Sequence, residues 1–568
     1  MKTSYALRIC IVILLGMFTF QSIQAQVNVQ NKFLQDPDLA IELADSSARF
    51  WFDSFDHQEG GFFTNVERNG QPSDDEKQMI TQSQNAYGMA RAFQLTGDTT
   101  YLNYGRKALD WMYENTWDEE HGGWLKDSDR KFAMDQHYAL IGPSAMFEAG
   151  NDSLDWKWLM KGYESNQNLW DNRPWAYGYY SEANLDWSDK SSKTFSATVD
   201  GITTHALYMY LMTKDEKYKE RLIQLGDNIV DHFVGSMDDM DLGFNESFDS
   251  NWGWDSSPNW QGNVGDFPFT GHFTKSAWCL ARIYQIEPKP EYLEAAQKIL
   301  NDVLAKQDQY DEKISQWWEY EEGFTSGVMN YYLTEKPEYL EFADGNLIKI
   351  METLWDTEYG EFYFFENNEH KGSYYKTSYH SVEMFYYIYL YGNLYLYDEP
   401  VSLYYRINPT EEERTISLYP LAFYDSLLTI SDVTLEGEAF TSFNGEDRSL
   451  TIAPGEGGIF KVTFEAQEGP ATATEPENEL PAAFALSQNY PNPFNPTTQI
   501  EYSINESGPV ALRVYDILGK EVATLVNGNQ SAGSHRVAFN AGELPSGVYI
   551  YQLRFGNRVE SRRMMLIK

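Results

Sequence analysis

The sequence predicts a multidomain protein, in which an all-α (α/α)6 barrel is followed by a small β-sandwich and a C-terminal β-sandwich. Three observations predict this class: a repeated helical hairpin before residue 400, strand periodicity after it, and a break in composition. All 16 tryptophans lie between Trp51 and Trp355, so the aromatic-rich part of the chain is the helical part.

The helical part contains four copies of one pattern: an apolar helix, a polar turn, a tyrosine and a second helix. The turn tyrosines are Tyr101, Tyr218, Tyr292 and Tyr339. The first interval is long enough for two copies, which predicts a degenerate copy around residues 138–188. Repeated helical hairpins form open solenoids or closed rings. The copies are unequal in length and rich in aromatic residues, which favours a ring of six hairpins over a uniform solenoid.

Short acidic segments alternate with the helices, as "FDHQEGGFFTN", "WDEEHGGWLKD" and "WDTEYGEFYFF". An acidic turn, a glycine and then aromatic residues predict a short hairpin between two helices. In a ring of helical hairpins, such loops would gather on one face.

The later parts of the chain have strand character. Segments such as "RSLTIAP" and "GIFKVTFEA" alternate apolar and polar residues between turn residues, and the sequence after them is rich in Pro, Ala, Thr and Glu, as linkers are. We expect five segments: a signal peptide (1–25), the barrel (27–398), a small β-sandwich (399–467), a linker (468–482) and a C-terminal β-sandwich (483–568).

The N-terminal residues read as a signal peptide. Lys2 and Arg8 precede an apolar stretch of about 12 residues, shorter than the roughly 18 that a membrane anchor needs. Small residues follow near Ala25. Removal of this segment takes Cys10 with it, so the exported chain keeps only Cys279 and has no internal disulfide. No later segment is apolar enough to span a membrane.

The formal net charge of −42 argues against nucleic acid and anionic membranes as partners, and disfavours a polyanionic substrate. A neutral mono- or oligosaccharide is the favoured ligand. The sequence shows no glycine-rich phosphate loop, no zinc spacing and no nucleophile elbow, so we expect neither a cofactor nor a metal.

Three of the nine histidines open apolar helices from loops of small or hydroxyl-bearing residues. They are His205 in "GITTHALYMY", His272 in "FTGHFTKSAW" and His380 in "KTSYHSVEMF". In a ring of hairpins this end of each inner helix faces the central funnel, so we expect the three to converge. The other six lie in acidic loops, in other helices or in the tail: His57, His121, His137, His232, His370 and His535.

At these segments the chain resembles the N-acylglucosamine 2-epimerase superfamily, which includes cellobiose 2-epimerases and aldose–ketose isomerases. The resemblance covers most of residues 30–395 and is carried by "FWFDSFDHQEGGFFTNVERNG", "TTHALYMYL", "GHFTKSAWCL", "QWWEYEEGFTSGVMNYYL" and "SYHSVEMFYY". It implies that His272 and His380 are the acid/base pair. The residues that it places around the substrate are His205, Glu322, Trp318, Trp124, Gln84, Tyr87 and Tyr379.

Three positions depart from the family pattern: Lys275 stands in place of a Glu, Gln84 in place of an Arg, and Thr203 in place of an Asn. The implied chemistry removes the proton at C2 of an open-chain sugar, next to the carbonyl, and returns it on the other face. Histidine suits this reaction because its reference pKa of about 6.5 lies near the working pH.

The C-terminal segment resembles the sorting domains of type IX secretion, through "NYPNPFNPTTQIEYSI", "LPSGVYIYQLRFG" and the basic end "RRMMLIK". This resemblance implies export to the cell surface or outside, with the type IX machinery as a partner. A generic carbohydrate-binding β-module is the alternative.

Two other functions remain open. A glycoside hydrolase on a six-hairpin barrel needs a carboxylate pair about 5 Å or about 6.5–9.5 Å apart. Its candidates are Asp238, Asp239, Asp241, Asp266, Glu319, Glu321 and Glu322. A non-catalytic sugar-binding protein would be consistent with the altered Gln84 and Lys275.

Overall fold

The computed structural model describes residues 29–126, 129–254, 269–365, 370–418, 420 and 428–466, and most of 485–566. The expected signal peptide and linker lie outside the described residues. The chain forms two compact units, Met1–Pro470 and Ala471–Lys568, which are treated separately below.

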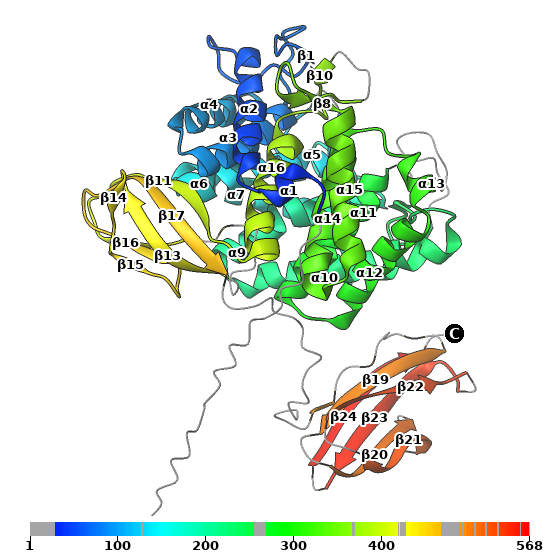
Figure 1. Cartoon of the computed structure of the whole chain (residues 1–568). Coiled ribbons are helices and arrows are strands. Elements are labelled where there is room, and N and C mark those ends of the chain that lie inside the picture. Colours follow the sequence, from blue (N-terminus) through cyan, green and yellow to red (C-terminus); the bar gives the residue numbers. More distant parts are fainter. Residues whose placement is uncertain are drawn as a thin grey trace, which may run out of the picture. The chain divides into compact units, whose positions relative to one another are not determined.

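Within the described residues, the first unit contains six helical hairpins, each made of an inner and an outer helix (Figure 1). The inner helices are buried on nearly all sides, whereas the outer helices keep a polar face. The pairs are α3 (Met79–Thr96) with α4 (Thr99–Asn115), α6 (Ile141–Gly150) with α7 (Ser153–Asn166), α9 (Leu207–Thr213) with α10 (Glu216–Asn228), α11 (Thr270–Ile286) with α12 (Pro290–Ala305), α14 (Trp317–Thr334) with α15 (Pro337–Thr353), and α16 (Tyr379–Tyr391) with α2 (Leu39–Phe50).

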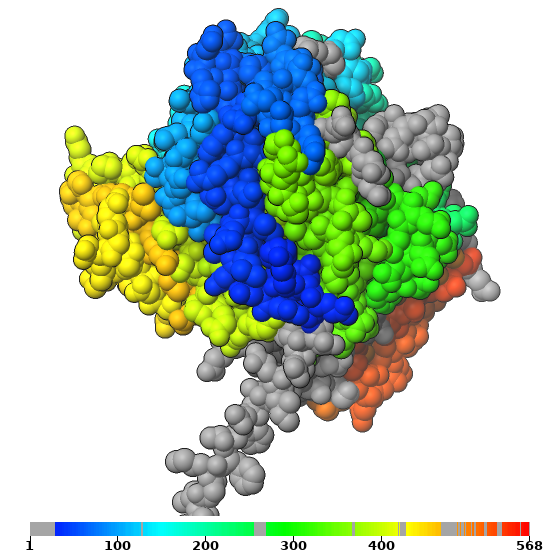
Figure 2. Space-filling view, turned by 45° about the horizontal axis from the view of Figure 1, so that its top comes forward, coloured from blue at the N-terminus to red at the C-terminus, as the bar shows by residue number. Residues whose placement is uncertain are grey.

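The sixth pair closes the ring, because it joins the first long helix to the last. Ser47 on α2 donates a hydrogen bond to Glu361 Oε2 at 2.6 Å, and the backbone N–H groups of Gln30 and Asn31 donate to Asp344 at 2.7 and 2.9 Å. In Figure 2 the blue N-terminal segment lies directly against the green segment from the end of the helical part. The predicted closed barrel is thereby confirmed, and an open superhelix is excluded.

The turn tyrosines join neighbouring outer helices. Each is buried near the start of its outer helix and directs its hydroxyl at the preceding outer helix. The contacts are Tyr101 with Asp45 (2.5 Å), Tyr218 with Met160 (3.8 Å), Tyr292 with Asp227 (2.6 Å) and Tyr339 with Asn301 (3.0 Å).

The expected degenerate copy is the α6–α7 hairpin. Asp155 stands three residues after the N-cap of α7, where the other copies carry tyrosine, and it forms an ion pair with Arg106 of α4. This hairpin therefore keeps the contact between neighbouring outer helices, but makes it with an ion pair in place of a tyrosine hydroxyl.

Lysines with buried side chains fasten three hairpins to the barrel: the first two acidic hairpins and the hairpin of β3 (Trp170–Asp171) and β4 (Gly178–Tyr179). Each lies two residues before an inner-barrel helix: α3, α5 (Ala133–Tyr138) or α8 (Phe195–Gly201). We call Lys77, Lys131 and Lys193 the hairpin lysines. Each binds an aspartate and a glycine carbonyl of one hairpin: Lys77 binds Asp56 (2.6 Å) and Gly60, Lys131 binds Asp118 (2.7 Å) and Gly122, and Lys193 binds Asp171 (3.2 Å) and Gly178.

A strand-rich region follows the barrel in the same unit. It contains two antiparallel sheets, ordered β11-β17-β13-β14 and β12-β16-β15. Strand β11 packs on α3 and α6, and its apolar side chains belong to the hydrophobic core of the barrel (Figure 1). The strands are β11 (Val401–Ile407), β12 (Arg414–Ser417), β13 (Leu428–Leu435), β14 (Glu438–Ala439), β15 (Phe443–Asn444), β16 (Ser449–Ile452) and β17 (Gly458–Ala466).

The second unit is also built of strands and has its own hydrophobic core. Its two sheets are ordered β18-β19-β22 and β21-β20-β23-β24. The strands are β18 (Ala485–Leu486), β19 (Thr497–Ile504), β20 (Gly508–Asp516), β21 (Glu521–Gln530), β22 (Gly533–Asn540), β23 (Gly547–Phe555) and β24 (Arg558–Leu566). Among the residues that the structure describes, no helix is both long enough and apolar enough to cross a membrane.

Candidate active site

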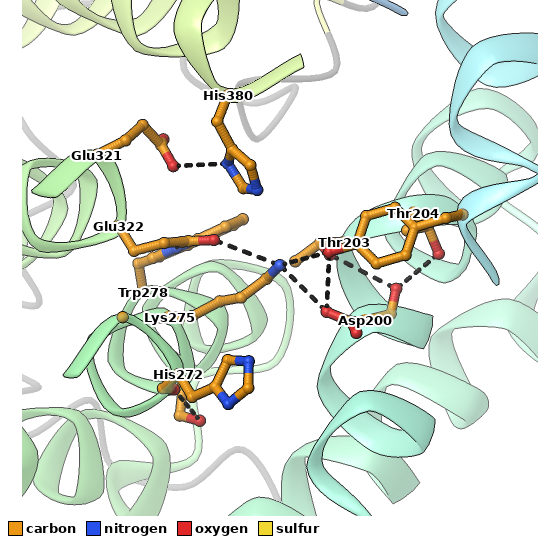
Figure 3. Close-up of polar contacts among 12 residues, drawn as sticks. Asp200, Thr203, Thr204, His272, Lys275, Trp278, Glu321, Glu322 and His380 are labelled. Atoms are coloured by element: carbon orange, nitrogen blue, oxygen red, sulfur yellow. Dashed lines mark hydrogen bonds and ion pairs between the residues drawn. The ribbon is translucent and has the colours of Figure 1, made fainter. Parts of the chain in front are cut away.

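Two histidines open inner helices at the same end of the barrel. His272 is the third residue of α11, and His380 is the second residue of α16. Figure 3 shows the two rings on opposite sides of one space. Both contact the half-buried ring of Trp318, with centroid distances of 5.2 Å for His272 and 6.0 Å for His380. The structure therefore brings together three of the residues that the sequence singled out.

The glycine before His272 is required by close packing of two inner helices. A Cβ atom at Gly271 would lie 2.4 Å from the Trp318 ring and 2.9 Å from Glu319 Cα. Both distances are shorter than real van der Waals contacts. Only glycine lets α11 approach α14 this closely, and that approach places His272 beside Trp318.

Each of the two imidazoles is held by a glutamate through Nδ1. Glu246 lies 3.0 and 3.1 Å from His272 Nδ1 through its two oxygens, and Glu321 Oε2 lies 3.1 Å from His380 Nδ1. A carboxylate at Nδ1 selects the tautomer in which Nδ1 carries the proton and Nε2 carries the lone pair. Both rings are thereby prepared to exchange a proton through Nε2.

These two glutamates were not recognised from the sequence as partners of the histidines. Glu246 lies 26 residues before His272 in an irregular segment, and Glu321 entered only as a carboxylate of the hydrolase alternative. No sequence spacing links either glutamate to its histidine, because the contacts join different hairpins.

Burial dominates the electrostatics of the site. It lowers the pKa of His380 well below the ordinary value, and the positive charges of Lys275 and Lys376 lower it further. The ring is therefore neutral near pH 7 and can act as a base. Burial also raises the pKa of Glu319 and of Glu383 to about 7.

Lys275 and Glu322 form an ion pair in the middle of the site. The ammonium Nζ lies 3.3 Å from Glu322 Oε1, and the other oxygen of Glu322 accepts a hydrogen bond from Trp278 Nε1 at 2.5 Å. Glu322 is thus engaged on both oxygens, which makes it an anchor of the site.

Three more of the expected residues lie on the side of the site that α3 and α16 form. Gln84 Oε1 accepts a hydrogen bond from Thr377 at 2.9 Å, and the Tyr87 hydroxyl donates to Glu383 at 2.5 Å. The Tyr379 ring lies 4.1 Å from the His380 ring. These contacts connect Gln84, Tyr87 and Tyr379 to the helix start that carries His380.

Two other expected residues are placed differently. Trp124 is only 1 % exposed and packs against Trp117 and Trp158, so, contrary to the expectation, it has no free face on which a sugar could stack. His205 is fully buried, stacked at 5.0 Å on His137. Among the described residues it contacts neither His272 nor His380. The third histidine of the expected set belongs to an adjoining aromatic cluster.

The carboxylates of the hydrolase alternative do not form a free pair in the described structure. Asp238 is exposed and pairs with Lys298 on the outer helix α12. Glu319 accepts backbone hydrogen bonds at the start of α14, while Glu321 holds His380 and Glu322 holds Lys275. The remaining candidates are Asp239 and Asp241, beside Asp238 in sequence, and Asp266, which lies outside the described residues.

One group could hold a metal ion by distance alone. Donor atoms of Glu321, His380 and Glu383 lie within 4.8 Å of one another. Hydrogen bonding accounts for the same contacts: Glu321 receives one from Thr325 at 2.9 Å, and Glu383 receives one from Tyr387 at 3.1 Å. We therefore attribute the closeness of these three side chains to hydrogen bonding around His380.

With this geometry in place, comparison with known proteins defines the class. The model of the N-acylglucosamine 2-epimerase (GlcNAc 2-epimerase) family matches residues 60–390, more than half of the chain. The chain belongs to this family of carbohydrate epimerases and isomerases. Residues 488–568 match a secretion system C-terminal sorting domain, so the protein is exported by type IX secretion to the cell surface or outside.

Individual relatives agree with the family assignment. The chain is 23% identical to the cellobiose 2-epimerase of Ruminococcus albus over 363 residues, covering 57% of this chain and 89% of the relative. The solved structure of the cellobiose 2-epimerase of Spirochaeta thermophila is similar with a TM-score of 0.56 and 19% identity, covering 64% of this chain and 98% of that one. A D-mannose isomerase structure gives a TM-score of 0.55 at 18% identity, covering 64% and 98%. At these identities the solved structures show a common fold.

Proposed function

We propose that the protein epimerises a neutral sugar at C2, or interconverts an aldose and a ketose, with His272 and His380 as its acid/base pair. The observation that carries the proposal is the matched pair of imidazoles. Each is held at Nδ1 by a glutamate, and both flank Trp318. Two oriented bases on opposite sides of one space are what proton removal and return at a single carbon require.

The proton moves in two steps in this proposal. The neutral Nε2 of His380 removes the C2 proton of the open-chain sugar, and the electron pair passes to the carbonyl oxygen to give an enediolate. His272 enters this step as the imidazolium, with Nδ1–H on Glu246, and delivers its Nε2 proton to the opposite face of C2, which restores the C1 carbonyl and gives the epimer. Delivery to C1 instead, with the hydroxyl proton on O2 passing to O1, gives the ketose. Trp318 supplies an apolar ring against which a sugar face can stack.

Gln84 is the proposed donor to the sugar carbonyl. Its Oε1 already accepts a hydrogen bond from Thr377, which leaves the amide NH2 as the group for a sugar oxygen. A neutral amide stabilises an enediolate oxygen less than a guanidinium does. The positive charge that stabilises the enediolate in this site must therefore come from another residue.

Solvent isotope exchange tests the proposal directly. Cellobiose and mannose, which the names of similar proteins suggest, are incubated with the enzyme in D2O and followed by NMR. We expect deuterium at C2 of the product and a loss of about 10²-fold or more in rate for His272→Asn and His380→Asn. No deuterium incorporation with any neutral sugar, or full activity of both variants, would refute it. New reducing ends would instead indicate a hydrolase.

We also propose finer boundaries for the chain. The sheets of residues 399–467 would form a small β-sandwich docked on the barrel, and residues 483–568 a second β-sandwich after a linker. The separate sheets and the separate core of the second unit support this division.

A further inference from the structure

Lys275 occupies a position that no other buried lysine of the described barrel shares. It follows His272 by three residues on α11, and its side chain is 2 % exposed. In Figure 3 the tip of Lys275 lies between His272 and His380. A positive charge is thus fixed in the space where the proposed reaction takes place.

The ammonium group has three oxygen partners. Nζ lies 3.1 Å from Asp200 Oδ1, 3.3 Å from Glu322 Oε1 and 3.3 Å from the Tyr138 hydroxyl. These partners come from α8, α14 and α5, so one side chain connects four helices. An ammonium has three hydrogens, and three partners use them all. Lys275 therefore has no hydrogen left to donate to a sugar oxygen. It acts through its positive charge and through the residues that it holds in place.

The charge on Lys275 is stable. Burial by itself would lower the pKa of this lysine, but its acidic partners raise the pKa well above the usual value. The Tyr138 hydroxyl also lies 3.3 Å from Asp200 Oδ1, which closes the network. The cluster is held from several sides and has little freedom to reorganise when charge develops nearby.

The inference rests on the proposed function. We propose that Lys275 is a positioning residue for the C2 proton exchange: it holds Asp200, Glu322 and Tyr138 in place and supplies the fixed positive charge that stabilises the enediolate between the two histidines. A charge already in place, in a site of low dielectric, stabilises a developing anion without the cost of reorganisation. Without it, Asp200 and Glu322 would oppose the anion.

The charged groups that face His380 show why the effect should be measurable. They are Glu321 on α14, Glu383 on its own helix, Lys275 on α11 and Lys376 in the segment before α16. Loss of Lys275 leaves Lys376 as the remaining cation in this group, and Lys376 is engaged by Glu361 at 2.8 Å. The surroundings of His380 then become more negative.

The test compares Lys275→Met with Lys275→Arg and with the matched control Lys131→Met. Lys131 is also a buried lysine paired with an aspartate, but its contacts lie in a hairpin. We expect Lys275→Met to lower kcat about 10²-fold with little change in KM, Lys275→Arg to recover part of the loss, and Lys131→Met to keep kcat within about 3-fold at temperatures where it is folded. If the kcat of Lys275→Met falls no further than that of the control, the proposal is wrong.

A second readout does not depend on turnover. The His380 ring is followed by NMR during a pH titration of the wild type and of both Met variants. We expect its titration to move to higher pH in Lys275→Met and to stay unchanged in Lys131→Met. An unchanged titration in Lys275→Met overturns the inference even if the wild type epimerises sugars. A shift without any C2 exchange in the wild type would overturn the proposed function alone.

If Lys275→Met fails to fold, the double variant Lys275→Met/Asp200→Asn removes the cation and one of its anions together. We expect it to fold, to keep the low kcat and to shift the His380 titration. Wild-type kcat in this double variant would refute the role of the charge.

Discussion

The hairpin lysines and Lys275 use the same chemistry in two regions. In both regions the lysine lowers the pKa of the carboxyl group beside it, but the net shift of that pKa differs. In the hairpins, burial alone would raise the pKa of Asp118, but Lys131 and two backbone N–H groups hold it below its usual value. In the funnel, burial raises the pKa of Glu322 although Lys275 lies beside it. Two differences account for this contrast: Glu322 is more deeply buried than Asp118, and it has two donors where Asp118 has three.

The comparison distinguishes the carboxylates that hold a hairpin in place from those that surround the two histidines. A hairpin aspartate has a lysine and backbone groups of its own, so it stays ionised and fastens a loop. The funnel gathers Glu321, Glu322 and Glu383. The charge of Glu322 raises the pKa of both others, and that of Glu383 raises the pKa of Glu321. Buried carboxyl groups with raised pKa values that gather beside the two histidines are candidates for proton transfer.

The largest expected effect is on stability in the hairpin region. Lys131→Met leaves Asp118 buried without its cation, and breaking a buried ion pair from one side costs about 3–5 kcal/mol in the free energy of unfolding. Denaturant-induced unfolding measures it. A loss below about 1 kcal/mol would mean that the hairpin lysines do not fasten the hairpins.

Next in size is the effect of the orienting glutamates on turnover. Glu246→Gln and Glu321→Gln replace an acceptor at Nδ1 by a group that can also donate, which favours the wrong tautomer of the histidine. We expect kcat to fall at least about 10-fold in each variant. The exposed Glu358, which pairs with Arg68, gives a control in Glu358→Gln with unchanged kcat. Unchanged kcat in both site variants would break the link between the glutamates and the reaction.

A pH-dependent effect on stability, smaller than that of Lys131→Met, is expected for Glu383→Gln. Burial raises the pKa of Glu383 from 4.5 to about 7. A carboxyl group with a higher pKa in the folded state keeps its proton longer than in the unfolded state, so the wild type loses stability as the pH rises from about 4.5 to 7. Relative to the wild type, the free energy of unfolding of the variant should therefore rise by up to about 3 kcal/mol between pH 4 and pH 8, since each pKa unit corresponds to about 1.4 kcal/mol.

The sign of that trend is the decisive observation, and thermal unfolding in a series of buffers records it. A hairpin carboxyl should give the reverse trend. Because the pKa of Asp118 is lowered, its contribution is present above its unfolded pKa of about 4 and is lost as the pH falls through the lower folded value. If Glu383→Gln followed the hairpin trend, the contrast between the two regions would be wrong.

The smallest expected effect is that of the tail. Removal of residues 471–568 takes away a unit with its own core and should leave kcat of the purified enzyme unchanged while abolishing export. Turnover of the truncated protein and its location in the producing cell are measured together. A large loss of kcat would place the tail in the catalytic unit.

Much of the fold follows from local patterns. The turn tyrosines and the long interval after Tyr101 predicted a ring of hairpins with one degenerate copy, and the α6–α7 hairpin with Asp155 is that copy. Local patterns suffice here because each hairpin repeats the same amphipathic rule. The position of His272 and His380 could also be predicted, since each lies where a loop passes into an inner helix.

Other features depended on tertiary contacts that the local pattern does not show. Trp124 read as a rim aromatic, but its neighbours Trp117 and Trp158 bury it. His205 was expected to open an inner helix, but it lies inside an uninterrupted helical run from Phe195 to Thr213 and packs on His137. Periodicity places a residue on a face of a helix, but it does not say which hairpin covers that face.

By itself, the sequence determined the helical class, the number of hairpins, the exported destination and the position of His272 and His380 at the starts of inner helices, because all of these reside in short segments with their own physical rules. Only the tertiary structure decided which carboxylate holds which ring, and that Lys275 carries its charge between the histidines with Asp200, Glu322 and Tyr138 around it. The reason is that burial and mutual distance set the energy of a charge, and both arise only when the six hairpins close.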